Sequence, residues 1–429
     1  MLQVIYTILY SFGFLLLSPA FVYKMWKRGK YRENFFQRFG RYAPELRQQL
    51  AGKTTPRIWI QAVSVGEMNL ALLLVSALRK QFPTHQLIVT TTTSTGCAFG
   101  RERLPVDVTL LYFPQDFPWS VRRAYNLIQP DCIVLMESEV WPNHIWEGAR
   151  RNVPIFMVNA RMSPRSARRQ QYGQWLFRHI FDKITLVGAQ SQEDAENFRR
   201  FGAPRVEMTG NLKYDASLSN GGAAPVNVRQ VLDGLGVTGV RPIFVAGSTW
   251  PGEEEIIFAA LTELRQKVPD LFLVLVPRHV ERTPEIVELA TRQNIKLAFR
   301  KGGAPVANPD CLLVNTTGEL KWFYEVATVI FVGKSLVGEG GQNIVEAAAS
   351  GHPVVFGPNM QNFKAIAAEF VEAGAGVQVV DRSEFVHALR DLLHDEQLRA
   401  KVAGAAKSVI ARNVGATNRT IELIAASLR

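Results

Sequence analysis

The sequence predicts an α/β protein in which two doubly wound domains follow an apolar N-terminal segment. Three observations support this prediction. The chain has 429 residues, which exceeds the length of about 250 to 300 residues at which a single hydrophobic core stops growing. Short apolar runs alternate with helix-length amphipathic stretches, as in the βαβ units of a parallel sheet. This alternation is interrupted once, near residue 220, and then restarts.

The composition indicates a globular protein with an anionic partner. Hydrophobic residues make up 47% of the chain and charged residues 20%, which is typical of a folded protein and not of a disordered one. The formal net charge of +11 suits nucleic acid, an anionic membrane surface or a phosphorylated substrate, and composition does not choose among them. Cys97, Cys132 and Cys311 lie far apart, so we expect buried thiols in a reducing compartment, no metal site and no cofactor.

Residues 1–23 are predicted to be a membrane anchor. Residues 2–23 carry no charge and are long enough to span a hydrocarbon core as a helix. The basic residues that follow are Lys24, Lys27, Arg28, Lys30 and Arg32. Because this charge comes after the apolar run, the segment differs from a cleaved signal peptide, and the body of the protein is expected on the cytoplasmic side of the membrane. The alternative is a monotopic helix in the membrane plane, kinked at Gly13 and Pro19.

The first α/β domain is predicted over residues 24–215. Its strands are expected at 57–63, 86–91, 108–112, 132–136, 155–158, 184–188 and 206–209. Helix-length stretches such as 70–81 and 192–201 separate them, and this spacing favours a parallel sheet.

A stretch of small and turn-forming residues, 217–225, predicts an interdomain linker within 216–240, followed by a second α/β domain over 241–429. Its strands are expected at 243–246, 271–276, 296–298, 312–314, 329–332 and 353–356, with helices at 253–268, 283–292 and 343–349. We also consider that the last helix packs back on the first domain. Two such domains facing each other would leave a ligand cleft between them.

Glu67 is the first candidate for a catalytic group. The apolar run 59–63 reads as a strand, Ser64 and Gly66 as a turn, and a helical pattern begins at Met68. Open α/β sheets bind ligands at the carboxyl ends of their strands, so a carboxylate at this place could act as a general base. The alternative is that Glu67 only favours a helix N-terminus, as acidic residues do.

A glycine-rich segment, 331–358, predicts a nucleotide site in the second domain. It reads as strand, glycine loop, helix and strand, in which backbone N–H groups could approach a phosphate. Asn343 and Glu346 are three residues apart and are expected on one face of the helix, with Glu346 as an acceptor for ribose hydroxyls. The segment is not a Walker loop, because Thr328 stands where that motif needs its first glycine.

Two further clusters follow predicted strands of the second domain. Ser248 and Thr249 could contact a ligand or cap the next helix. Arg278 follows strand 271–276, where a guanidinium group could meet a phosphate. His279 beside it is expected to form hydrogen bonds and not to bind a metal.

With these stretches identified, the chain resembles the bacterial 3-deoxy-D-manno-octulosonic acid (Kdo) transferases almost from end to end. The matching segments, in the family's order, are Val63-Ser64-Val65-Gly66-Glu67, Met136-Glu137-Ser138-Glu139-Val140-Trp141-Pro142-Asn143, Val158-Asn159-Ala160-Arg161-Met162-Ser163, Gly210-Asn211-Leu212-Lys213-Tyr214-Asp215, Val276-Pro277-Arg278-His279, Thr317-Gly318-Glu319-Leu320 and the glycine-rich segment. Departures from the family pattern are Gln342, where many members have His, and Lys334, which replaces a second glycine.

The resemblance implies an inverting glycosyltransferase of the GT-B architecture, glycosyltransferase family 30. It would transfer Kdo from CMP-Kdo to the phosphorylated lipid A precursor, lipid IVA, at the bacterial inner membrane during lipopolysaccharide synthesis. It implies that Glu67 is the general base and that Glu137 lies near the acceptor and the sugar. The donor-binding residues that it implies, with the two clusters above, are Lys213, Ser248, Arg278, His279, Thr317, Gly318, Glu319, Gly333, Ser335, Asn343 and Glu346.

Two rival interpretations stay open at this point. The chain could be a membrane-associated transferase with the same fold that uses another nucleotide sugar. It could also be a non-catalytic, membrane-anchored nucleotide binder, in which Glu67 would only begin a helix. A nucleic-acid binder is disfavoured, because the basic residues are dispersed and no recognised nucleic-acid module is present.

Overall fold

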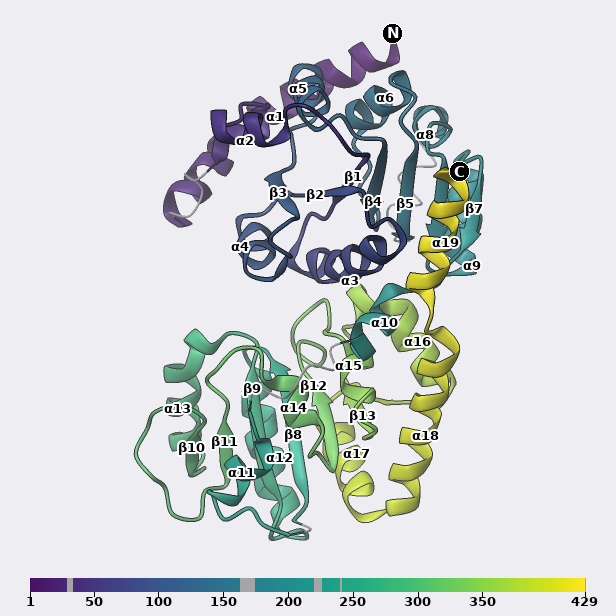
Figure 1. Cartoon of the computed structure of the whole chain (residues 1–429). Helices are drawn as coiled ribbons and strands as arrows, with labels where there is room; N and C mark the ends of the chain where they lie inside the picture. Colours follow the sequence, from purple (N-terminus) through teal and green to yellow (C-terminus); the bar gives the residue numbers. More distant parts are fainter. Residues whose placement is uncertain (29–33, 163–173, 220–225, 240, 429) are drawn as a thin grey trace. The chain divides into compact units, whose positions relative to one another are not determined.

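The computed structural model describes residues 1–28, 34–162, 174–219, 226–239 and 241–428. Lys30 and Arg32 of the basic stretch, Ser163 of one family segment and residues 220–225 of the predicted linker lie outside this range. The chain divides into an N-terminal unit, Met1–Ala216 with Val414–Arg429, and a C-terminal unit, Ser217–Asn413. Each unit contains one sheet, shown in Figure 1.

The N-terminal unit has a seven-stranded parallel sheet of order β3-β2-β1-β4-β5-β6-β7. Its strands are β1 (Arg57–Gln61), β2 (Gln86–Thr91), β3 (Thr109–Tyr112), β4 (Cys132–Met136), β5 (Ile155–Ala160), β6 (Leu186–Ala189) and β7 (Val206–Met208). The chain starts at the central strand β1, builds outward through β2 and β3, and then continues from β4 on the other side of β1. This is the doubly wound topology.

Helices and side chains pack against both faces of this sheet. The helical elements are α1 (Leu2–Arg28), η1 (Phe35–Phe39), α2 (Pro44–Leu50), α3 (Val65–Gln81), α4 (Ser94–Arg103), α5 (Pro118–Ile128), α6 (Pro142–Arg150), α8 (Gln174–Phe181), α9 (Gln192–Arg200), α10 (Leu212–Ser219) and α19 (Ala416–Leu428). Residues alternate between the two faces along a strand. Ile58 and Ile60 of β1 accordingly join a core with α3 and α19, while Trp59 joins a second core with α5 and α9.

The C-terminal unit repeats this architecture with a parallel sheet of order β10-β11-β9-β8-β12-β13-β14. Its strands are β8 (Ile243–Thr249), β9 (Phe272–Pro277), β10 (Leu297–Phe299), β11 (Cys311–Leu313), β12 (Val329–Val332), β13 (Val354–Phe356) and β14 (Val377–Gln378). Its helical elements are α11 (Val228–Asp233), α12 (Glu253–Arg265), η2 (Val280–Arg282), α13 (Thr283–Arg292), α14 (Leu320–Tyr324), α15 (Ile344–Ala348), η3 (Gln361–Phe363), α16 (Lys364–Glu372), α17 (Arg382–His394) and α18 (Glu396–Asn413). The predicted fold class, two doubly wound α/β domains, is confirmed.

Two local predictions for the stretch around Glu67 were wrong. Helix α3 begins at Val65, with Ser64 as its N-cap, so Gly66 lies in the first helical turn and not in a glycine turn. Gly66 does not have a positive φ. The glycine therefore gave a misleading turn signal.

Comparable errors occur in the second domain. Strand β8 continues to Thr249, and α12 is capped by Gly252, so Ser248 and Thr249 are strand residues and not helix caps. Helix α15 is only five residues long, and Asn343 is its N-cap. The side-chain oxygen of Asn343 accepts from the Val345 amide at 3.1 Å. Asn343 therefore lies at the cap position just before the helix, and Glu346 lies in its first turn.

The last helix, α19, belongs to the N-terminal unit, where it packs against α3. Asp215 holds its start, because the two carboxylate oxygens accept from the amides of Gly415 at 2.7 Å and Thr417 at 2.6 Å. The guanidinium group of Arg419 also donates to the carbonyl of Thr209 at 2.9 Å. A cap contributed from 200 residues away thus fixes the C-terminal segment to the first sheet's unit.

Candidate active site

In the N-terminal sheet, the strand order reverses between β1 and β4. Ligands of open α/β sheets bind outside the carboxyl ends of the strands at such a reversal. Glu67 follows β1 and Glu137 follows β4. The topology therefore places both predicted catalytic carboxylates at this switch point.

Glu67 occupies the third position of α3 and forms a capping box with Ser64. The Ser64 hydroxyl accepts from the Glu67 amide at 3.3 Å, while the Glu67 carboxylate accepts from the Val63 amide at 2.8 Å. These bonds fix the carboxylate at the strand end. The helix-start role considered for Glu67 is thus present in the structure, and it also orients the side chain.

The surroundings of Glu67 raise the pKa of its carboxyl to about 7. Burial is the largest cause, and repulsion from the nearby carboxylates of Glu137 and Glu139 adds to it, whereas the bonds from Val63 and Ser64 lower the pKa. A general base is most effective when its pKa lies near the working pH. The environment of Glu67 meets that requirement.

Glu137 is held in an unusual backbone conformation immediately after β4. Its φ of 54° lies in the left-handed region, which non-glycine residues adopt rarely and mostly where the surrounding structure imposes it. The side chain is 10% exposed, and its carboxylate pairs with the Arg161 guanidinium at 2.8 Å. The amide of Glu137 donates to the carbonyl of Val158 at 2.9 Å, which ties this turn to β5.

Lys213 supplies a second cation to this group. Burial lowers the pKa of its ammonium, with Arg161 adding to the effect, while Glu137 and Glu67 oppose it. Lys213 therefore interacts electrostatically with both candidate catalytic carboxylates. The N-terminal unit combines three acidic groups and two cations at this edge of the sheet.

A network of amide side chains positions the Lys213 segment. Gln190 donates to the Asn159 carbonyl at 2.7 Å, and Asn211 donates to the Gln190 side chain at 2.8 Å. The side-chain oxygen of Asn159 accepts from the Leu212 amide at 3.0 Å. Sequence reasoning did not single out Gln190, because it lies outside the family segments and has no distinctive spacing.

In the C-terminal unit, the strand order reverses between β8 and β12, and most predicted donor-binding residues lie at that carboxyl edge. Arg278 is exposed after β9, and Thr317 and Gly318 are exposed beyond β11. Gly318 has a φ of 85°, so its loop uses a conformation that favours glycine. The side chains available to a ligand come from these loops.

The glycine-rich loop after β12 is organised around a buried carboxylate, that of Glu253, which is 0% exposed. It accepts from the amides of Trp250 at 2.9 Å, Lys334 at 2.7 Å, Ser335 at 2.9 Å and Leu336 at 3.0 Å. Burial raises the pKa of Glu253, and the amides lower it. We correct the expectation that these loop amides bind the donor's phosphate, because the protein's own carboxylate already occupies them.

Several predicted donor-binding residues have partners within the protein. Ser335 is 0% exposed. Its hydroxyl donates to the Val332 carbonyl and accepts from the Gly357 amide. A Cβ at Gly333 would lie 2.6 Å from the Ser248 carbonyl oxygen, so glycine permits the close approach of β8 and β12. Glu319 pairs with Arg300 at 2.8 Å.

Glu346 and His279 are placed differently. Burial raises the pKa of Glu346, while the charges of Lys321 and Arg278 lower it. Glu346 and Arg278 therefore interact electrostatically. His279 packs edge-on against Trp250, with ring centroids 5.1 Å apart, and its Nδ1 lies 3.4 Å from the carboxylate of Glu281.

Two other features bear on what the protein binds. Within the described ranges, no group of three or more His, Cys, Asp or Glu side chains could hold a metal ion. A pocket of about 650 Å³ in the N-terminal unit lies among segments that precede β1 and β4, and its lining includes Arg41, Arg47 and Arg123. This pocket is separate from the candidate catalytic carboxylates.

The comparison with known proteins decides the family. Residues 33–216 match the model described as 3-deoxy-D-manno-octulosonic-acid transferase (kdotransferase). A 3-deoxy-D-manno-octulosonic acid transferase of Haemophilus influenzae is 32% identical over 93% of this chain and 92% of its own length. The chain belongs to the Kdo transferase family. A Bordetella pertussis transferase of the same name is also 32% identical, over 95% of this chain and 96% of its own.

The fold comparison agrees with the GT-B prediction. The solved UDP-GlcNAc 2-epimerase of Neisseria meningitidis, bound to UDP-GlcNAc, covers 83% of this chain with a TM-score of 0.58 at 13% identity. At this identity the similarity concerns the fold alone. Family and fold predictions made from the sequence motifs are therefore both confirmed.

Proposed function

We propose that this member of the Kdo transferase family transfers Kdo from CMP-Kdo to a phosphorylated lipid A precursor, lipid IVA, with inversion at the anomeric carbon. The observation that carries the proposal is the Glu67 carboxyl, fixed at the switch point of the first sheet with a pKa raised to about 7. At neutral pH, a carboxyl group with that pKa is present in comparable amounts in its protonated and its ionised form. It can therefore accept a proton and release it again, as a general base must.

The proposed reaction is a single displacement. An acceptor hydroxyl oxygen forms a bond to the anomeric carbon of Kdo, and the bond from that carbon to the phosphate oxygen of CMP breaks. Glu67 takes the hydroxyl proton, and CMP leaves with the bonding electron pair. Glu137 would lie beside the sugar, where its negative charge stabilises the positive charge that develops on the ring. Lys213 would pair with the Kdo carboxylate.

The second domain would bind the CMP part of the donor. Arg278 is exposed at a strand end and suits the phosphate. Thr317 and Gly318 would contact the nucleotide from their exposed loop, with Glu346 and Asn343 at the ribose. Gly333 and Ser335 would act through the shape of their loop, because Ser335 is fully buried. Ser248, His279 and Glu319 remain further candidates at the same edge.

The family and the N-terminus support the proposed acceptor and cell location. Helix α1 includes a segment, Leu2–Pro19, with a mean hydropathy of 1.5, long and apolar enough to cross a membrane. We place the enzyme at the bacterial inner membrane, with both α/β domains on the cytoplasmic face. The net charge of +11 would attract an anionic lipid acceptor and anionic headgroups.

The decisive experiment incubates the purified full-length protein with CMP-Kdo, generated in place, and a tetraacylated lipid A precursor. Mass spectrometry of the lipid would show Kdo transfer and the number of sugars added. We expect Glu67→Gln to lose nearly all transfer while CMP still protects the variant against thermal unfolding. Glu193→Gln, at an exposed acid on α9, is the matched control and should retain activity.

Other outcomes would favour the rival functions. Wild-type turnover by Glu67→Gln would refute the base assignment. Protection by UDP-sugars but not by CMP would point to another nucleotide-sugar donor. Binding of CMP without transfer to any lipid acceptor would indicate a non-catalytic nucleotide binder.

A further inference from the structure

Helix α1 has two distinct faces along residues 3–17. Gln3, Tyr6, Thr7 and Tyr10 recur at the three- and four-residue spacing of one helical face. The other face carries large apolar side chains that are 45% to 70% exposed: Val4, Ile5, Ile8, Leu9, Phe12, Leu15 and Leu16. The helix is therefore amphipathic as docked, although its sequence carries no charge before Lys24.

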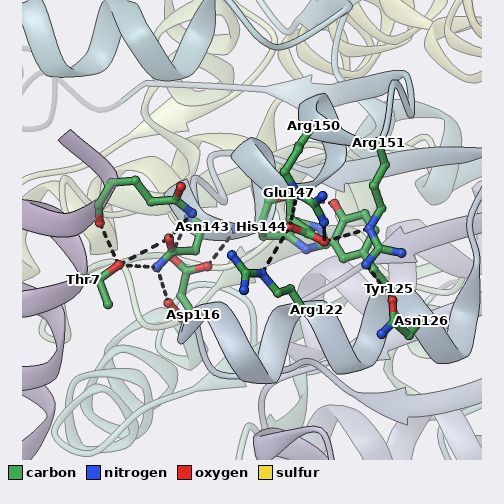
Figure 2. Close-up of polar contacts among 11 residues, drawn as sticks. Thr7, Asp116, Arg122, Tyr125, Asn126, Asn143, His144, Glu147, Arg150 and Arg151 are labelled. Atoms are coloured by element: carbon green, nitrogen blue, oxygen red, sulfur yellow. Dashed lines mark hydrogen bonds and ion pairs between the residues drawn. The ribbon is translucent and has the colours of Figure 1, made fainter. Parts of the chain in front are cut away.

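The polar face is bonded to the N-terminal unit through the loop before α5 and the start of α6. The Tyr6 hydroxyl donates to the Asp116 carboxylate at 2.9 Å, and the Tyr10 hydroxyl donates to Gln115 at 2.8 Å. Gln3 donates to the Asn143 side chain at 3.0 Å. Figure 2 shows the side chain of Thr7 joined to that of Asn143, which is in turn joined to Asp116.

Asp116 connects the docking of α1 to the fold itself. Its carboxylate accepts from the amides of Asn143 at 3.0 Å and His144 at 2.9 Å, which are in the first turn of α6. The side chain is 0% exposed. The carboxylate that caps α6 thus also accepts the hydrogen bond from Tyr6. Helix α1 therefore binds to a site that the domain requires for its own structure.

Aromatic packing extends the contact between α1 and the N-terminal unit. Phe117 contacts Tyr10 and Phe14, each with ring centroids 5.1 Å apart. Trp119 stacks on Phe117 with ring centroids 4.5 Å apart and is 49% exposed. Tryptophan is enriched where a protein meets the interface of a bilayer. A groove of about 370 Å³ also runs beside α1, lined by Gly13, Leu17 and their neighbours.

These contacts are difficult to reconcile with a helix that crosses the membrane. To span it, residues 2–19 would have to leave the domain and carry the polar groups of Gln3, Tyr6 and Tyr10 into hydrocarbon without partners. Each unpaired polar group there costs several kcal/mol. A helix in the membrane plane keeps all these bonds and inserts only its apolar face into the headgroup and acyl boundary.

We propose that α1 is a monotopic anchor, clamped lengthwise on the N-terminal domain, that inserts its apolar face into one leaflet of an anionic bilayer without crossing it. The basic residues Lys24, Lys27 and Arg28 that follow in the sequence complement anionic headgroups. This inference rests on the membrane location in the proposed function, and it decides between the two anchoring modes that the sequence left open.

The first test is the side of the membrane on which the N-terminus lies. Full-length protein carries one protease-cleavable tag before Met1 and another after Arg429. In inverted inner-membrane vesicles we expect protease to remove both tags, and in spheroplasts to remove neither. A single-pass helix would instead expose the N-terminal tag to protease in spheroplasts and protect it in inverted vesicles. That result would overturn the proposal.

The second test measures flotation with vesicles of phosphatidylethanolamine and phosphatidylglycerol. Leu9→Ser combined with Leu16→Ser should lower vesicle affinity by about tenfold or more, since each leucine loses apolar burial. The melting temperature should not change, because both side chains are exposed. Val380→Ser, at a 60% exposed position in the C-terminal unit, is the control and should bind like the wild type.

The outcomes separate this proposal from the enzymatic one. Unchanged binding by the double leucine variant would overturn the apolar face as the anchor. Failure of the wild-type protein to float would overturn any membrane location. Kdo transfer to a detergent-dispersed acceptor is measured independently, so a failure of the proposed function would appear there and not in these two assays.

Discussion

Replacement of Glu253 by Gln should release the glycine-rich loop. One carboxylate oxygen accepts from the amides of Ser335 and Leu336, and the other from Trp250 and Lys334. Every close partner is a donor, so an NH2 group in place of one oxygen would face two amides that need an acceptor. Hydrogen bonds to a charged group contribute about 1.5 to 3 kcal/mol each. The loss of two should destabilise the loop by roughly 3 to 6 kcal/mol.

Hydrogen exchange followed by mass spectrometry measures this loss directly, since local opening determines amide protection. Because about 1.4 kcal/mol corresponds to a factor of ten, protection of the amides at 334–336 should fall by roughly two to four orders of magnitude. Peptides from β9 report whether the domain remains folded. Glu255→Gln, at an exposed acid in the same turn of α12, is the control. Unchanged protection at 334–336 in the Glu253 variant would refute the assignment.

Three further outcomes are expected. Because protonation of Glu67, with its pKa of about 7, removes the base, kcat/KM should fall as the pH drops below about 7. Glu139→Gln removes one repulsive charge near Glu67, so in a pH–rate profile of this variant the acidic fall in kcat/KM should occur at lower pH. Gly357→Ala should cost at least about 3 kcal/mol in urea unfolding, because its Cβ would lie 2.1 Å from a backbone oxygen of the glycine-rich loop. Gly404→Ala, in α18 with nothing within 4 Å, should instead gain about 0.5 to 1 kcal/mol. Asp215→Ala removes the acceptor of the Gly415 and Thr417 amides at the start of α19 and should cost about 2 kcal/mol, with faster proteolysis of the C-terminal helix.

The sequence predicted the sheets well because buried parallel strands are short apolar runs, and such runs stand out between amphipathic helices. Strands β2, β4 and β12 have the predicted limits. Strand β14 was missed because Val377–Gln378 is only two residues long, which gives no periodicity to detect. The early start of α3 was missed because Gly66 suggested a turn, although its backbone is helical.

The active-site interactions were less predictable, since they join residues distant in sequence. Glu253 and the amide of Lys334 are 81 positions apart, and no local pattern indicates that one binds the other. A glycine-rich loop before a short helix has the same sequence signature whether its amides bind a ligand or an internal carboxylate. Only the fold shows which of the two occupies them.

Glu67 and Glu253 illustrate how far sequence position alone can identify a catalytic acid. Each follows a glycine and lies in the first turn of the helix after the central strand of its sheet, β1 or β8. Their sequence contexts therefore support the same interpretation, an acid at a strand end that favours a helix start.

Their environments separate them. Glu253 has no exposed surface and satisfies four backbone amides with its two oxygens, so it has no capacity left for a substrate proton. Glu67 accepts from the Val63 amide, and burial raises its pKa, with the charges of Glu137 and Glu139 adding to the effect. Repulsion between neighbouring acids makes a carboxylate a better proton acceptor, whereas saturation by amides makes it a structural anion. That difference supports the proposal that Glu67 is the base, and Glu67→Gln should therefore abolish transfer while leaving CMP binding intact.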